Sequence, residues 1–171
     1  MVKEIKEGVW EGVGRMKKNI IVEYDDREPN YQLDSDLNVL NMTFNKVRLK
    51  IGDYVYKNII VERKTIDDLC ASIVDKRIET QVEKMKKSRK ECYIFIVGHL
   101  KDRKSELNKN CVLGKVVSLL FKHDMKIMWC EDEIQFLWCL RNLFDKYDEK
   151  YQIITKADMI LKGQIPVEEA K

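Results

Sequence analysis

Two periods of apolar residues alternate along the chain. Short runs rich in Ile, Val, Tyr and Phe predict strands at 19–24, 46–51, 53–55, 58–63, 92–97 and 126–130. Most of these runs are continuously apolar, which is typical of strands that are covered on both faces. Apolar residues at helical spacing predict helices over 66–73, 78–85, 112–120 and 134–147. The order of the elements therefore predicts an α/β domain in which helices cover a central sheet.

Composition is consistent with one folded domain. The chain has 171 residues and 44% hydrophobic content, which is enough for a core. Its charges nearly cancel, because 32 Lys and Arg against 29 Asp and Glu leave a net charge of +3. This balance does not by itself indicate a nucleic-acid partner. Such a partner has to be inferred from local clusters of charge.

The cysteines indicate a reducing compartment. Five of them, at 70, 92, 111, 130 and 139, form no C-x-x-C pair and leave an odd one over, so we expect small hydrophobic residues of the core. A zinc site would need more closely spaced Cys and His ligands. We see no secretory leader and no apolar run near the roughly 18 residues that a bilayer requires. We therefore expect no membrane partner and an intracellular protein, nuclear in a eukaryote and cytoplasmic in a prokaryote.

The stretch "GDYVYKNIIVERKTIDDL" at 52–69 ends a predicted strand with three consecutive charges. Alternate side chains of a strand share a face, so Glu62 and Lys64 point one way and Arg63 the other. If residues 56–58 turn the chain back, Asp53 comes opposite the end of the second strand. A metal-dependent phosphodiesterase needs such a set, because Mg²⁺ takes oxygen ligands and a cation can steady the attacking water or the phosphate.

A solvated run of charges is the competing interpretation of the same stretch. Asp, Glu and Lys at these spacings are common in a chain with 36% charged residues. The surrounding sequence is therefore needed to decide between them.

Three separated stretches resemble the XPF/Hef family of structure-specific DNA endonucleases. Residues 52–69 are similar to the family signature GD-x(n)-ERK-x-x-x-D, "YDDRE" at 24–28 to the acidic end of its first strand, and "SIVDKRIETQVEKMKK" to the helical segment that follows the signature. The resemblance covers roughly residues 20 to 150 in the family's order. It implies a restriction-endonuclease-like α/β core with a central mixed β-sheet flanked by helices, and cleavage of branched double-stranded DNA, such as flaps or forks, in repair or recombination.

The resemblance also implies roles for individual residues, with Mg²⁺ or Mn²⁺ as cofactor. Asp53 and Glu62 would bind the metal with support from Asp25 and Glu28. The residues implied in catalysis are Asp53, Glu62, Arg63, Lys64, Arg27 and Asp68.

Some of these residues have structural alternatives. Thr65 to Asp68 forms a capping box, so Asp68 could serve mainly to begin a helix. Arg63 could pair with Asp25 or Glu28 and hold the first strand in place. Asp25 itself follows an apolar strand and could be a turn residue.

A basic run at 84–90 is a candidate DNA-contacting surface, because neutralised phosphates supply most nonspecific affinity. Its cations could equally be a solvated helix end that complements the helix dipole. They are Lys84, Lys86, Lys87, Arg89 and Lys90.

The chain departs from the family in two places. Related nucleases often place a Glu after the strand that corresponds to 92–97, whereas Gly98 and His99 follow it in this sequence. Only 21 residues follow Lys150, too few for the tandem helix-hairpin-helix domain that usually continues family members. We expect an N-terminal appendage at 1–18, an XPF-type nuclease domain at 19–150 and a tail or short helix at 151–171.

A catalytically silent DNA-binding scaffold, or the partner subunit of an active nuclease, is the alternative function. The Asp53, Glu62, Arg63 and Lys64 set argues against a scaffold, which has no need to keep like charges together. We also expect a homodimer, or a heterodimer with a related nuclease-fold subunit, through the helix at 131–148 and the elements next to it. Its Trp138, Phe144 and Tyr147 are aromatic residues of the kind that favours interfaces.

Overall fold

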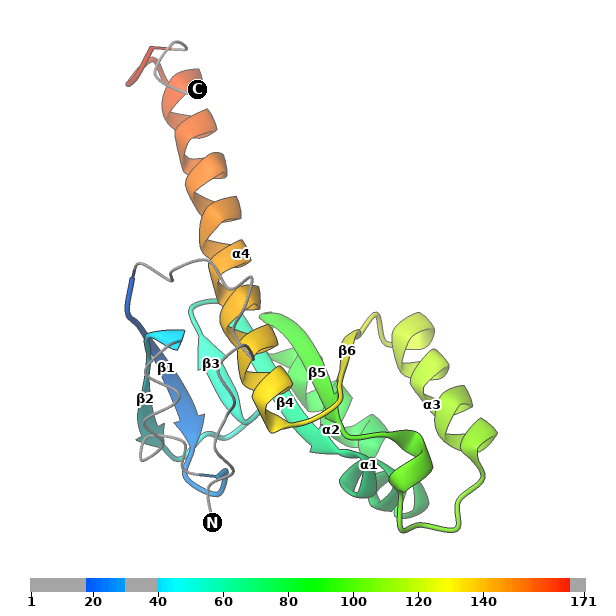
Figure 1. The fold of residues 1–171 in the computed structure, drawn as a ribbon. Coiled ribbons are helices and arrows are strands. Elements are labelled where there is room, and N and C mark those ends of the chain that lie inside the picture. The colour runs from blue at the N-terminus through cyan, green and yellow to red at the C-terminus, as the bar shows by residue number, and fades with distance from the viewer. Residues whose placement is uncertain (1–17, 30–39, 167–171) are drawn as a thin grey trace. The chain divides into compact units, whose positions relative to one another are not determined.

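The computed structural model describes residues 18–29 and 40–166. Within them, six strands form one mixed sheet in the order β2-β1-β3-β4-β5-β6 (Figure 1). The strands are β1 (Ile20–Asp25), β2 (Met42–Val47), β3 (Tyr54–Tyr56), β4 (Ile59–Thr65), β5 (Glu91–Val97) and β6 (Lys126–Cys130). The helices are α1 (Ile66–Val74), α2 (Ile78–Lys87), α3 (Lys109–Lys122) and α4 (Glu133–Leu161), with a short 3₁₀ helix η2 (Leu100–Asp102). The predicted restriction-endonuclease-like α/β class is confirmed, whereas the predicted appendage lies almost wholly outside the described residues.

The second strand differs from its predicted position. We expected it at 46–51, but β2 occupies 42–47 and pairs in parallel with β1, Ile20 opposite Met42. Phe44 is the reason, because it is the strand's one fully buried side chain, at 3% exposure. The apolar residues Leu49 and Ile51 belong instead to the connection that leads to β3.

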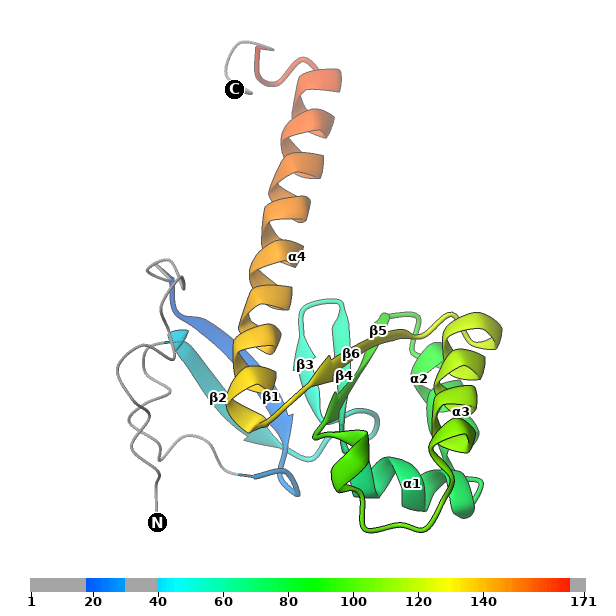
Figure 2. The ribbon, with the colours of Figure 1, turned by 45° about the vertical axis from the view of Figure 1, so that its right-hand side comes forward.

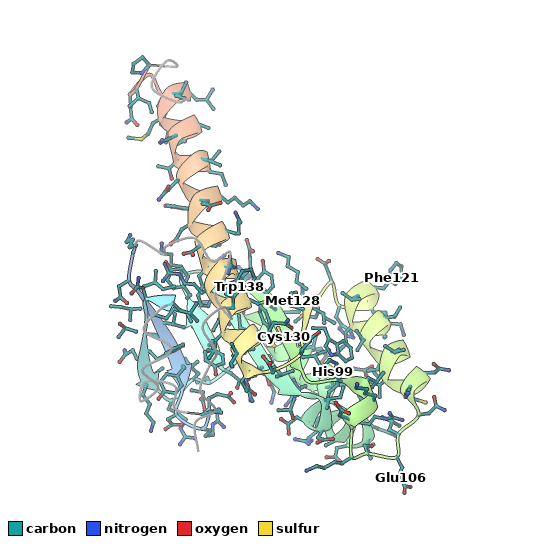
Figure 3. All side chains as sticks on the ribbon, viewed as in Figure 1. His99, Glu106, Phe121, Met128, Cys130 and Trp138 are labelled. Atoms are coloured by element: carbon teal, nitrogen blue, oxygen red, sulfur yellow. The ribbon has the colours of Figure 1, made fainter. Side chains whose placement is uncertain are left out.

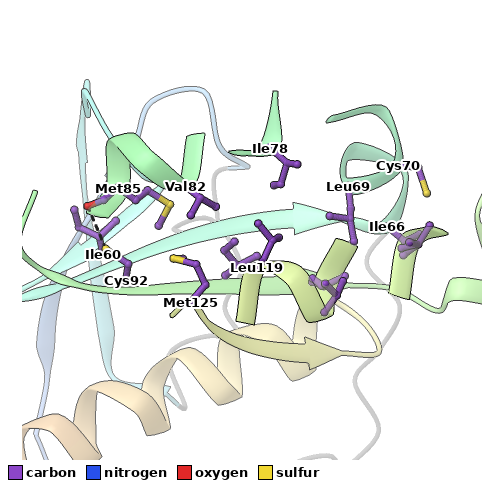
Figure 4. Close-up of a cluster of buried hydrophobic side chains, with 14 residues drawn as sticks. Ile60, Ile66, Leu69, Cys70, Ile78, Val82, Met85, Cys92, Leu119 and Met125 are labelled. Carbon is purple, nitrogen blue, oxygen red and sulfur yellow. Dashed lines mark hydrogen bonds between the residues drawn. The ribbon is translucent and has the colours of Figure 1, made fainter. Parts of the chain in front are cut away.

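The main hydrophobic core lies on one face of the sheet. It packs β-strand residues such as Ile60, Ile94 and Ile96 against Leu69 of α1 and Leu119 of α3 (Figure 4). The views in Figures 1 and 2 show α1, α2 and α3 covering this part of the sheet. Three helices on one face thereby leave the other face for a second cluster.

Aromatic rings fill the second face. Tyr24, Phe44 and Tyr54 form successive edge contacts at 5.8 and 6.2 Å between ring centroids. Phe136, in the first turn of α4, contacts both Tyr54 at 5.4 Å and Phe95 at 5.5 Å. Such pairs add roughly 0.5–1.5 kcal/mol each beyond the area that they bury. They hold β1, β3 and β5 in register beside the charged strand ends.

The cysteines mostly follow the prediction. Cys70, Cys92 and Cys130 are buried, while Cys111 is exposed. The Cys92 thiol donates to the Met85 carbonyl at 3.2 Å, which ties β5 to α2 (Figure 4).

Helix α4 is longer than predicted. It continues to Leu161, so residue 151, where we expected a tail or short helix, lies inside it. From residue 137 onward, the described part of the chain forms a separate compact unit. Phe144 is fully buried, so its predicted role as interface surface is wrong. Among the described helices, none has the length and apolar character to cross a bilayer.

Candidate active site

The candidate site begins at Gly52, which lets two strands approach closely. Its φ of +75° is in the left-handed region, and a Cβ at this position would lie 2.4 Å from Cγ2 of Ile60. Glycine alone tolerates both conditions. The backbone of the next residue, Asp53, is held on both sides. Its carbonyl accepts from the Asp25 N–H at 2.8 Å, and its N–H donates to the Val61 carbonyl at 2.9 Å. The glycine of the signature thus sets the position of the aspartate that follows it.

Asp53 and Glu62 lie close together where the hairpin of β3 and β4 ends. The hairpin pairs Tyr54 with Val61, and the two acids that follow line the same cleft and act on each other's pKa. The Asp53 carboxylate also accepts the backbone N–H of Arg63 at 2.8 Å. The two-residue turn at Lys57 and Asn58 closes the hairpin in this register.

Lys64 shares a strand face with Glu62. Its ammonium lies 3.8 Å from Glu62 Oε1, and its side chain is only 6% exposed. Because the ammonium is buried and paired with Glu62, its positive charge stays next to the carboxylates of Glu62 and Asp53.

Arg63 makes a different set of contacts. Its guanidinium pairs with both oxygens of Glu133, one of them through Nε at 2.9 Å, and reaches Glu28 at 3.5 Å. The alternative in which Arg63 pairs with Glu28 is therefore what the structure contains. Glu133 was not identified from sequence, because it lies 70 residues from Arg63 and carries no motif.

Asp25 holds the connection before Gly52 in place. Its carboxylate accepts from Arg27 Nε at 2.5 Å and from the Leu49 N–H at 3.0 Å, and it is 1% exposed. The hydrogen bond from Arg27 is the main cause that lowers the pKa of Asp25 to about 2. Asp25 is therefore fully occupied by protein donors, and its predicted metal contact stays a prediction.

The other three acids, Glu28, Asp53 and Glu62, have raised pKa values because they are partly buried and repel one another. Burial, and then the neighbouring charge of Glu62, raise the pKa of Asp53 to about 7. Burial likewise raises the pKa of Glu62, against the lowering effect of Lys64. The pKa of Glu28 rises to about 7, first from burial and then from the charge of Asp53. Acids placed in this way favour a positive charge between them.

The four acids Asp25, Glu28, Asp53 and Glu62 all line one open cleft of about 470 Å³. Its lining includes the predicted residues Asp25, Arg27, Glu28, Asp53, Glu62 and Lys84, and also Lys50, Ile51, Gly52, Gln81 and Met85. Gln81 and Lys50 were not among the candidate residues. A polar, uncharged residue inside a helix gives no sequence signal that would have identified it.

The predicted DNA-binding run is only partly directed at the cleft. Lys84 lines it. Lys86 and Lys90 donate to backbone carbonyls of other segments, each at 3.2 Å. Lys87 and Arg89 are exposed and are not part of the lining.

Asp68 does not line the cleft either. Its N–H donates to the Thr65 hydroxyl at 3.1 Å, which begins α1, and its side chain is exposed. This geometry favours the capping interpretation.

The carboxylates do not enclose a metal ion by themselves. In the described part of the chain, no three His, Cys, Asp or Glu side chains form a group that could do so. The pair of Asp53 and Glu62 is compatible with Mg²⁺, which is usually bound by one or two carboxylates together with waters and substrate phosphates.

A family model described as the ERCC4 domain matches residues 24–143. The chain is 30% identical over 115 residues to a Methanocaldococcus jannaschii protein named as an ATP-dependent RNA helicase, covering 67% of this chain and 14% of that protein. It is 26% identical over 125 residues to the 3'-flap repair endonuclease Xpf of Saccharolobus solfataricus, covering 72% of this chain and 54% of that protein.

A solved structure has the same fold. XPF from Aeropyrum pernix in complex with DNA superposes with a TM-score of 0.67 at 23% identity, covering 76% of this chain and 66% of that one. The chain thus spans about half, or less, of the length of the curated relatives that it matches.

Proposed function

Because the chain belongs to the ERCC4-domain family of XPF-type nucleases, we propose that it is a divalent-metal-dependent endonuclease. It hydrolyses a phosphodiester bond near a branch, such as a flap or fork, in DNA repair or recombination. The observation that supports this most is that Asp53 and Glu62 line one cleft, with the ammonium of Lys64 3.8 Å from Glu62 Oε1.

Asp53 and Glu62 would hold Mg²⁺ or Mn²⁺. Both carboxylates have a raised pKa from burial, so a bound cation would offset their repulsion. When bound, such an ion polarises a phosphoryl oxygen and lowers the pKa of a coordinated water. No covalent enzyme intermediate is required.

The cations have separate tasks. Lys64 is held against Glu62, where its ammonium can steady the attacking water or the reacting phosphate. Arg27, Lys50 and Lys84 line the same cleft and would contact the backbone phosphates on either side. Arg63 is a positioning residue, because its contacts with Glu28 and Glu133 keep the end of β4 in place.

Cleavage of a labelled three-way flap, with and without Mn²⁺, tests this function. We expect cleavage that requires the metal and disappears in Asp53→Asn and Glu62→Gln. Binding of the flap without cleavage by the parent would favour the alternative, a catalytically silent scaffold or partner subunit. The proposal then fails while the family assignment stands.

We also propose that the protein is intracellular and forms a dimer. Because Phe144 of α4 is buried, an exposed apolar stripe of α3 is a better candidate for the dimer surface than Phe144. Leu113, Val117, Leu120 and Phe121 lie on that stripe at helical spacing, and Phe121 is 89% exposed. Figure 3 shows Phe121 directed outward from the end of α3.

A further inference from the structure

Gln81 occupies a boundary position on α2. Ile78 and Val82 of the same helix are buried in the core, while Gln81, Lys84 and the buried Met85 line the cleft. Helical spacing places residues 81 and 84 next to each other on one side of the helix. Gln81 is therefore directed to the same space as Asp53 and Glu62, although it comes from a different element.

The amide oxygen of Gln81 is buried and has no hydrogen-bond partner in the described part of the chain. Buried polar atoms without partners are rare in folded proteins, because each carries the full cost of its desolvation. An amide oxygen can accept from a proton donor or bind a cation, and it can do nothing else. Its missing partner must therefore bring positive charge or a proton into the cleft.

We propose that Gln81 supplies an uncharged oxygen ligand to the divalent metal ion of this cleft, which rests on the function proposed above. Mg²⁺ and Mn²⁺ take carboxylate, amide carbonyl and water oxygens. Asp53, Glu62 and Glu28 already repel one another, since each raises the pKa of at least one other. A neutral donor adds coordination without adding to this repulsion.

Titration of the protein with Mn²⁺, followed by the paramagnetic resonance signal of the free ion, tests the role without any cleavage assay. Gln81→Leu removes the oxygen and should weaken Mn²⁺ binding about 10-fold. Gln81→Glu keeps an oxygen and adds charge, so it should bind Mn²⁺ at least as tightly as the parent. Gln152→Leu, at an exposed position of α4 outside the cleft lining, should bind like the parent.

The melting temperature without metal gives a second readout. Gln81→Leu removes an unpaired buried oxygen, so its metal-free form should melt at the same temperature as the parent or higher. A lower melting temperature would show that the amide has a structural partner and would overturn the proposal.

The two proposals fail separately. If the parent binds no Mn²⁺, the metal site itself is wrong and the role of Gln81 is wrong with it. If the parent binds Mn²⁺ and Asp53→Asn does not, but Gln81→Leu binds like the parent, only the role of Gln81 is overturned. Equal weakening in the Leu and Glu variants would show that the amide N–H is used instead, which also overturns it.

Discussion

Replacing Asp53 by Asn should stabilise the metal-free protein above neutral pH. Folding raises the pKa of Asp53 from 3.8 to about 7, mainly through burial and then through the charge of Glu62. The folded state therefore binds its proton more tightly than the unfolded state, and stability falls as the pH rises from about 4 to 7. One pH unit of displacement is worth about 1.4 kcal/mol, which sets an upper limit of about 4 kcal/mol.

The expected gain is smaller than that limit. Asp53 and Glu62 share one repulsion, and water in the open cleft screens it. We expect Asp53→Asn to gain on the order of 2 kcal/mol at pH 8, or about 6 °C in melting temperature. At pH 5 only the first part of the fall between pH 4 and 7 has taken place, so the difference between parent and variant should be clearly smaller than at pH 8.

Melting curves at pH 5 and pH 8, with and without Mn²⁺, measure both effects. Metal at a hundredfold excess over its dissociation constant should stabilise the parent by about 2.7 kcal/mol and the variant much less. The exposed Asp102, changed to Asn, should alter neither curve. A variant that is less stable than the parent at pH 8, or a difference that is the same at both pH values, would refute the electrostatic reasoning.

Three further substitutions test separate parts of the structure. Lys64→Met should lower the cleavage rate about 10²-fold or more and change Mn²⁺ affinity only slightly; a loss of affinity equal to that of a carboxylate variant would contradict its assigned role. Gly52→Ala should cost about 2 kcal/mol in urea unfolding, because its Cβ meets Ile60 at a positive φ; Gly114→Ala in α3, with open space around it, should be neutral or stabilising. Phe121→Ser should leave the melting temperature unchanged but reduce the fraction of dimer measured by light scattering, because Phe121 is exposed. If the parent is monomeric at high micromolar concentration, the dimer prediction is wrong.

Part of the site could be predicted because it is local. Asp53 and Glu62 belong to one hairpin, and a two-residue turn together with the period of two in strands determines which residues oppose each other. The same period separates Lys64 from Arg63 and places Lys64 beside Glu62. The cap at Thr65 depends on three successive residues and is likewise local.

Residues that reach the site from distant elements could not be predicted. Glu133 comes to Arg63 from the start of α4, and Gln81 reaches the cleft only because α2 buries its apolar side against the sheet. The position of β2 was also a tertiary outcome, since Phe44 packs against Tyr24 and Tyr54 and so decides the register. Periodicity specifies which side of an element is apolar but not which element it meets.

The sequence by itself determined the order of the elements, the hairpin and the acid pair with its lysine, because these follow from spacing within a few residues. Only the tertiary structure decided which charges remain available for chemistry. Arg27 and Leu49 satisfy the Asp25 carboxylate, which lowers its pKa, whereas packing partly buries Asp53 and Glu62, which raises theirs. Burial and partner geometry depend on contacts between segments far apart in the chain, so identical carboxylates acquire different properties only after folding.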